Sequence, residues 1–239
     1  MHQSESDNFI QATIVGKTHV RIQRLNNDTD WNQTVHAINW FDARQLQLYN
    51  FYNSLAARSV HKVGGVPIFK GRLLSQQFGS DKDKRQVLLL VKYPSPKDFK
   101  NMLGDTYFKC VSLFRKLAVK RFTFCLSHKV GAEDIPKERG RFDNYGVHHF
   151  RGDINTLELI QSSLKQNSID VSFSSLKTHQ LFIVSGNNDP EAVPAIMDGI
   201  VLFRCQDETT LYNIVNSEPY KRSLEHSKSS YVGLYQRIM

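Results

Sequence analysis

The feature of this sequence that most constrains its fold is a strand and helix order that occurs twice along the chain. Patterns typical of strand, helix, strand, strand, helix and strand follow one another over residues 18–128, and again over residues 144–237. Each series therefore gives the order βαββαβ. The sequence predicts an α+β protein of two tandem units, each with an antiparallel sheet.

The first series begins with alternating apolar residues at 19–25, which predict a strand. After a polar loop at 26–34, the segment 39–61 predicts a helix, because its apolar residues recur at helical spacing. Gly64 and Gly65 follow this helix and suit a left-handed cap at its end. The apolar stripe consists of Leu48, Phe51, Tyr52, Leu55 and Ala56.

Two more strands and a second helix continue this series. Because Pro67 has no backbone N–H, the strand at 66–73 should lie at a sheet edge. The apolar run at 86–93 should be a central strand, and Ser95 is a natural N-cap for the next helix. In ferredoxin-like βαββαβ units strand two is an edge and strand three is central, which agrees with these patterns. The strand that closes the series is predicted at 120–127.

The second series repeats this order with weaker signals. A helix break followed by a tyrosine occurs in both series, so Tyr107 and Tyr220 are predicted to be equivalent. The predicted elements are strand 145–151, helix 155–166, extended segment 169–184, strand 195–205, helix 207–227 and strand 231–237. The predicted organisation is a polar N-terminal tail at 1–17, ferredoxin-like repeat one at 18–128, a linker at 129–143 and repeat two at 144–239.

Composition argues against several kinds of partner. The net charge is +8, but the 31 Lys and Arg residues are spread along the chain among 23 acidic residues, so nucleic-acid binding is not expected. The 3 cysteines have no metal-ligand spacing, which predicts free thiols and no metal site. No apolar run is long enough to span a membrane, and the polar N-terminus does not resemble a signal peptide. These features predict a cytoplasmic protein without membrane contact.

Two motifs in the first series resemble those of a known superfamily. The first is Val63-Gly64-Gly65 after a Tyr-rich helix, where the relatives have Tyr-Gly-Gly. The second runs from Tyr93-Pro94-Ser95 to Tyr107 and Arg115, with Thr106 near the place of a family proline. Both resemble motifs of small bacterial proteins of unknown function in the dimeric α/β-barrel superfamily. The resemblance covers residues 18–128 and, more weakly, 144–237, so the chain looks like a tandem duplication of that unit.

This resemblance implies a barrel formed by two facing sheets, with ligands between a sheet and its own helices. The superfamily includes cofactor-free monooxygenases, lactone isomerases, polyketide cyclases, haem enzymes and proteins with no known activity, so the fold does not select one activity. The hypothesis is therefore a small-molecule-binding barrel protein. Its enzymatic form would be a cofactor-independent monooxygenase, isomerase or cyclase with an aromatic or polyketide-like substrate. Whether the chain is an enzyme stays open, and a homodimer is compatible with the resemblance.

No catalytic motif is present, so the candidate residues rest on their type and position. A strand histidine that faces a pocket can act as a general base near neutral pH, which makes His149 a catalytic candidate. Arg115 is the second, because it matches the helix arginine of the relatives and a guanidinium can bind a carboxylate or enolate. A buried core histidine and a structural ion pair are the ordinary interpretations of these two residues. The ligand-binding candidates are His19, Arg21, Tyr52, Tyr107, Arg151 and Tyr220.

Two alternatives stay open. No acid–base group stands out and the second series lacks the paired glycines, so the chain could be a non-catalytic module that binds or assembles proteins. The other alternative is a haem protein, by analogy with the haem-binding relatives, with His226 in the last helix as the axial ligand. Apart from this alternative, the sequence predicts no cofactor.

Overall fold

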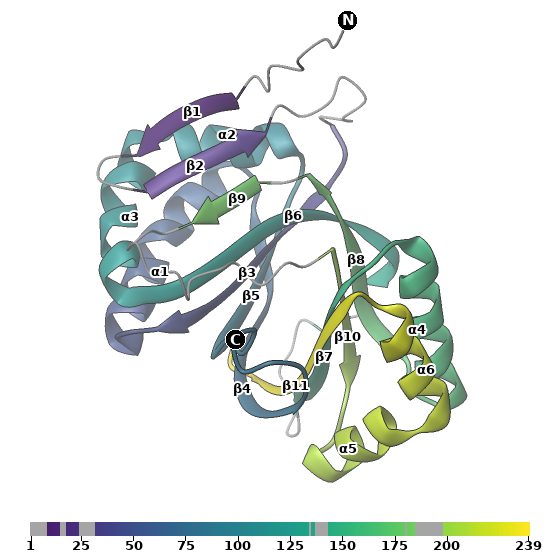
Figure 1. The fold of residues 1–239 in the computed structure, drawn as a ribbon. Helices are drawn as coiled ribbons and strands as arrows, with labels where there is room; N and C mark the ends of the chain where they lie inside the picture. The colour runs from purple at the N-terminus through teal and green to yellow at the C-terminus, as the bar shows by residue number, and fades with distance from the viewer. Residues whose placement is uncertain are drawn as a thin grey trace, which may run out of the picture.

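The computed structural model describes residues 9–14, 18–23, 32–133, 135–136, 143–179, 181–184 and 198–239. Two βαββαβ series follow one another, and we call residues 35–133 the first unit and residues 144–237 the second unit. Figure 1 shows the helices of the two units on opposite sides of a central barrel of strands. The predicted α+β architecture of two units with antiparallel sheets is confirmed.

The elements of both units agree with the predicted order. The first unit consists of β3 (Val35–Ala43), α1 (Leu46–Lys62), β4 (Val66–Phe78), β5 (Val87–Tyr93), α2 (Pro96–Gly104), α3 (Thr106–Ala118) and β6 (Val119–Glu133). The second unit consists of β7 (Asn144–Arg151), α4 (Ile154–Gln166), β8 (Val171–His179), β10 (Gly199–Arg204), α5 (Glu208–Asn216), α6 (Glu218–His226) and β11 (Ser229–Arg237). A third, smaller sheet contains β1 (Phe9–Ile14), β2 (Thr18–Gln23) and β9 (Leu181–Val184).

The two sheets join edge to edge into one closed barrel. The strand order is β10-β7-β11-β4-β5-β3-β6-β8, and β8 pairs with β10 to close it. Each unit thus has the order second, third, first, fourth strand, as in ferredoxin-like sheets. Antiparallel pairing of β4 with β11 and of β6 with β8 removes the free edges of both sheets. A single chain therefore completes the barrel without a second copy.

The strands are buried on both faces, because one face lines the barrel and the other packs on helices. In β3, Ile38 and Trp40 belong to the core inside the barrel, whereas Ala37 and Phe41 belong to the core under α1 to α3. The core inside the barrel also includes Phe69, Leu88, Tyr145, Val147, Phe173, Ile200, Leu202, Tyr231 and Tyr235. The helix-facing side of the first unit is the layer that holds the candidate site.

Local sequence signals set several element ends. Ser95 accepts a hydrogen bond from the Asp98 backbone N–H and caps α2, as predicted. Asp105 separates α2 from α3 and caps α3 through the Tyr107 N–H, so the predicted helix break before Tyr107 is also confirmed. Gly64 has a φ of +73° and donates to the His61 carbonyl, which is the left-handed helix end expected there.

The first strand of the first unit differs from the prediction. The expected strand at 19–25 overlaps β2, but β2 belongs to the small sheet, where it pairs with β1 and β9. The first strand of the unit is β3, whereas the sequence predicts no element at 35–38 and the start of a helix at 39. Because β3 is buried on both faces and contains Asn39 and Asp42, it lacks the polar alternation that marks a half-exposed strand.

The domain boundaries stay a prediction, and strands occupy parts of the predicted tail and linker. The predicted tail at 1–17 contains β1, and its other residues lie outside the described part of the chain. β6 continues to Glu133, past the predicted start of the linker at 129, and residues 134 and 137–142 of that linker also lie outside the described part. No helix in the described residues is long and apolar enough to cross a bilayer.

Candidate functional site

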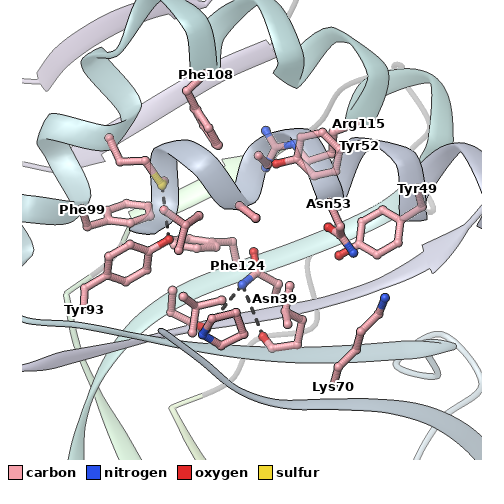
Figure 2. A pocket seen from close by; sticks show the side chains of 18 of the residues that line it. Asn39, Tyr49, Tyr52, Asn53, Lys70, Tyr93, Phe99, Phe108, Arg115 and Phe124 are labelled. Carbon is pink, nitrogen blue, oxygen red and sulfur yellow. Dashed lines mark hydrogen bonds between the residues drawn. The ribbon is translucent and has the colours of Figure 1, made fainter. Parts of the chain in front are cut away.

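A cavity of about 270 Å³ lies between the sheet of the first unit and its own helices. Its floor is formed by β3, β4, β5 and β6, and its roof by α1, α2 and α3 (Figure 2). Ligand pockets of proteins typically measure about 300–1,000 Å³. This cavity lies just below that range, so it suits a small molecule of one or two rings. The apolar lining includes Ala37, Ala56, Val60, Leu89, Val91, Phe99, Met102, Leu103, Phe108, Phe122 and Phe124.

Asn39 is the polar group on the cavity floor. Its Nδ2 donates to the backbone carbonyls of Ala37 and Leu89, each at 3.3 Å. These bonds fix the orientation of the carboxamide, which Figure 2 shows rising from the sheet toward the helices between Tyr93 and Tyr52. The side-chain oxygen of Asn39 can therefore accept a hydrogen bond from a hydroxyl or N–H group of a ligand.

Three tyrosines line the cavity and remain protonated at neutral pH. Burial raises the pKa of Tyr49, Tyr52 and Tyr93, and a raised phenol pKa means that the uncharged form is favoured. The Tyr93 hydroxyl donates to the sulfur of Met102 at 3.3 Å. Tyr49 and Tyr52 lie nearer to Arg115, which opposes part of the rise in their pKa. These phenols act as hydrogen-bond donors rather than as bases.

Lys70 and Arg115 bring positive charge to the same cavity. The Lys70 ammonium lies 5.2 Å from the ring centre of Tyr49 and donates to Asn50 Oδ1 at 3.2 Å. The Arg115 guanidinium lies 4.8 Å from the ring centre of Phe122. The described residues that line the cavity include no Asp, Glu, His or Cys. The arrangement can bind and polarise an electron-rich group, but its described lining offers no side chain that is a base near neutral pH.

The two units differ in the size of the side chains that separate sheet from helix. Counted from the N-cap residues Gln45 and Asp153, Ala56 of α1 corresponds to Leu164 of α4. Leu164 is fully buried in the core of the second unit, whereas the short side chain of Ala56 leaves room above the sheet of the first. At this helix position, a leucine fills the core of the second unit and an alanine leaves a cavity in the first.

The sheets show the same difference. In the first unit Val91 of β5 pairs with Ala37 of β3, and both line the cavity. In the second unit Phe203 of β10 pairs with Gly146 of β7, on the side that faces the helices. A Cβ atom on Gly146 would lie 2.3 Å from the Phe203 ring, so this ring occupies the space above the glycine. The cavity therefore results from small residues on both layers of the first unit.

The structure brings only two of the predicted site residues to this cavity, Arg115 and Tyr52. Tyr107 is 37% exposed on α3 and its ring lies 5.4 Å from the Arg58 guanidinium. Arg151 is exposed at the end of β7. Tyr220 is fully buried in the second unit, and the N-caps Asp105 and Ser217 make it equivalent to Phe108 rather than to Tyr107. His19 and Arg21 are predicted to lie on the first strand of the first unit. In the structure they lie on β2 of the small sheet, outside the barrel.

His149 lies inside the barrel, in a different layer from Arg115. Its ring stacks on Trp40 with 3.9 Å between ring centres, and the side chain is 2% exposed. Neither ring nitrogen has a hydrogen-bond partner among the described residues, and burial holds its pKa well below the ordinary value. The predicted pair of His149 and Arg115 therefore does not form one site in this structure.

The neighbouring His148 belongs to a hydrogen-bonded chain inside the second unit. The Tyr220 hydroxyl lies 2.9 Å from His148 Nδ1, and His148 Nε2 lies 3.0 Å from Ser230 Oγ. Burial lowers the pKa of His148 to about 3, so the ring is neutral at physiological pH. With the phenol as donor to Nδ1, Nε2 carries the proton and donates to Ser230, which leaves the serine without a base. We therefore assign these hydrogen bonds a structural role.

The residues at the cavity do not supply the histidine ligand suggested for haem. His226 is exposed on α6 of the second unit, and its Nδ1 lies 2.9 Å from the Arg222 carbonyl. The side chains of iron-binding type that line the cavity are tyrosines and Met102, and the Met102 sulfur already accepts from Tyr93. Haem binding by His226 stays a prediction without support from this geometry.

Sequence reasoning missed Lys70, Asn39, Asn53 and Tyr49 as cavity residues. Tyr49 and Asn53 lie near the helical stripe that the sequence showed, so the helix face itself was a usable signal. Lys70 lies on β4, which the sequence predicts to be an edge strand, where a lysine is normally a solvated surface residue. Asn39 was assigned to the start of a helix, so its place on the cavity floor could not be recognised.

Comparison with solved structures finds this arrangement in proteins of very low sequence identity. An anthrone oxidase-like protein aligns over 87% of this chain and 92% of its own, with 11% identity and a TM-score of 0.51. A mutant chlorite dismutase from Candidatus Nitrospira defluvii aligns over 88% of this chain and 93% of its own, with 12% identity and a TM-score of 0.50. A protein of unknown function from Rhodopseudomonas palustris aligns over 45% of this chain and 85% of its own, with 16% identity and a TM-score of 0.38. Comparison of the sequence itself finds no matching family model and no matching curated protein.

Proposed function

We propose that this chain, which has the fold of the dimeric α/β-barrel superfamily, binds a small aromatic molecule in the cavity of its first unit. The observation that carries the proposal is the aromatic-lined cavity of about 270 Å³ between sheet and helices. The corresponding positions of the second unit are filled by the buried side chains of Phe203 and Leu164. Cores are normally packed without voids of this size, which favours a binding role.

The lining suits flat rings. Phe99 and Phe124 stack with 5.2 Å between ring centres, and Tyr93 meets Phe99 edge to face at 5.2 Å. An aromatic ligand that packs against these rings would gain both apolar burial and favourable ring geometry. Asn39 and the protonated phenols of Tyr49 and Tyr52 would orient its polar atoms.

In an enzymatic form, the cavity would act on the charge that develops on the substrate. Protonated phenols and the cations Lys70 and Arg115 can stabilise an enolate or phenolate oxygen without a cofactor. That chemistry is common to cofactor-independent oxygenation, isomerisation and cyclisation of aromatic or polyketide-like molecules. The anthrone oxidase-like neighbour supports the first of these only as an analogy of fold.

Val91→Phe tests the proposal, because it places in the first unit the residue that fills the second. Naphthol binding would be measured by isothermal titration calorimetry for the wild type and for this variant. Leu159→Phe is the control, since Leu159 is 39% exposed on α4, away from the cavity. We expect the wild type and the control to bind naphthol alike and Val91→Phe to lose binding. Equal binding by all three proteins would refute the cavity as the site.

Oxygen uptake and product analysis with the same probe would separate turnover from binding alone. Consumption of naphthol by the wild type and not by Val91→Phe would establish an enzyme. Binding without consumption would leave a carrier or sensor of aromatic molecules.

A further inference from the structure

Polar and apolar side chains occupy opposite ends of the cavity in the first unit. Figure 2 shows Tyr93, Phe99 and Phe108 at one end, and Tyr49, Asn53 and Lys70 at the other, with Arg115 and Tyr52 above them. The ring-lined end lies under α2 and the start of α3, and the polar end lies between α1 and β4. A molecule that fills this space and matches its polarity has aromatic rings at one end and a polar group at the other.

The polar end carries the positive charges of Lys70 and Arg115, and no Asp or Glu is among the described residues that line it. Lys70 contacts a neutral amide and an aromatic face, and Arg115 contacts the face of Phe122. In the described part of the chain neither cation forms an ion pair. Removing an ammonium group from water is unfavourable unless an anion compensates, and burial indeed lowers the pKa of Lys70.

The segment after β11 partly shields this end from water. The Ile238 N–H donates to the Lys70 carbonyl at 2.8 Å, and Ile238 and Met239 both line the cavity beside Lys70. Apolar side chains at this place lower the local polarity, which strengthens the attraction between a cation and a bound anion. Residues that follow the second unit thus contribute to the recognition end of a cavity in the first.

From these observations we propose that the ligand is an aromatic carboxylate, with its rings against the stacked pair of Phe99 and Phe124 and its carboxylate between Lys70 and Arg115. This inference rests on the proposed function and adds the chemical class and the orientation of the ligand. A carboxylic acid is ionised at neutral pH, whereas an ordinary phenol is not, so only the acid arrives with the charge that the two cations need. The planar guanidinium of Arg115 matches the geometry of a carboxylate.

The test compares naphthoate with naphthamide, its uncharged counterpart of nearly the same shape. Isothermal titration calorimetry at neutral pH would measure both probes on the wild type, Lys70→Met, Arg115→Met, Lys70→Arg and Val91→Phe. We expect the wild type to bind naphthoate about tenfold or more tightly than naphthamide, as for other charge-assisted hydrogen bonds. Each methionine variant should lose most of that preference, because its affinity for naphthoate falls more than its affinity for naphthamide. Lys70→Arg should retain the preference, because it keeps the charge.

The possible failures are distinguishable. If the wild type binds naphthamide as tightly as naphthoate, the carboxylate inference is wrong, although the proposed cavity stands. If the methionine variants keep the full preference for naphthoate, the two cations are not the recognition site and the inference is again overturned. If neither probe binds, or if Val91→Phe binds both normally, the proposed function itself fails.

Discussion

A substitution that fills the cavity of the first unit should both stabilise the protein and abolish its ligand binding. Ala56→Leu adds three carbon atoms to a side chain that lines the cavity, at a place where the second unit already has Leu164. Burying each carbon is worth about 0.8 kcal/mol, which gives roughly 2.4 kcal/mol. Fixing the leucine side chain costs about 0.5–1 kcal/mol, so a net gain of roughly 1.5 kcal/mol remains. For a chain of this size that gain raises Tm by about 3–6 °C.

Urea unfolding and calorimetry of the ligand-free protein would measure this change, after native mass spectrometry has shown that no ligand is retained. Ala118→Leu is the matched control, because Ala118 is fully buried but does not line the cavity. Enlarging a side chain in a packed core costs about 1–3 kcal/mol, so the control should be destabilised. The sign of the two changes is decisive. If Ala56→Leu destabilises the protein as much as Ala118→Leu does, the cavity does not exist in solution and the reasoning is refuted.

Three further predictions concern the rest of the molecule. Burial lowers the pKa of His148 and His149, so the unfolded chain takes up protons that the folded chain does not. The free energy of unfolding should therefore fall as the pH drops below about 6.5, by up to about 1.4 kcal/mol per pH unit for each histidine. His149→Phe should make the loss of stability in acid shallower at little cost near neutral pH. His148→Phe should cost about 1–3 kcal/mol at neutral pH, because the buried Tyr220 hydroxyl loses its partner and Ser230 keeps only Ser227. Equal costs of the two changes in urea titrations would contradict this. Because one chain closes the barrel, Tm measured by circular dichroism should not change with protein concentration, and a clear rise with concentration would indicate that folding depends on a second copy. Added haem should give no Soret band that His226→Ala removes, and a band lost in that variant would restore the haem hypothesis.

The order of elements could be predicted because local chemistry and topology agree in most of the chain. Pro67 lies in β4 before Gly71, where the pairing with β11 begins, so its missing N–H does not interrupt that pairing. Ser95 and Asp153 cap α2 and α4 through their side chains, as residues of their type should. These signals depend on a few neighbouring residues, and tertiary packing does not override them.

The first strand of the first unit was not predicted, because its position depends on tertiary packing rather than on local signals. In β3, residues on both faces are buried, so the period of two that marks a half-exposed strand is absent. Its polar residues have partners far away in sequence, since Asp42 accepts from the Gln86 N–H and from Arg121. A segment with such residues is easily assigned to a loop or a helix start. The alternating segment at 19–25 predicts the first strand of the unit, although it forms β2 and pairs in the small sheet.

The site was harder to predict than the fold because it is defined by what the first unit lacks. Arg115 and Tyr52 could be chosen from helix positions, but nothing in their own residue type distinguishes a cavity from a packed core. The distinction appears only when Ala56 is set beside Leu164, and Val91 beside Phe203, which requires the register of both sheets and both helices. Leaving that space empty lowers stability, and binding sites commonly trade stability for function in this way. The second unit, which has the same strand order and no comparable gap at these positions, is therefore the internal reference against which the first unit can be engineered.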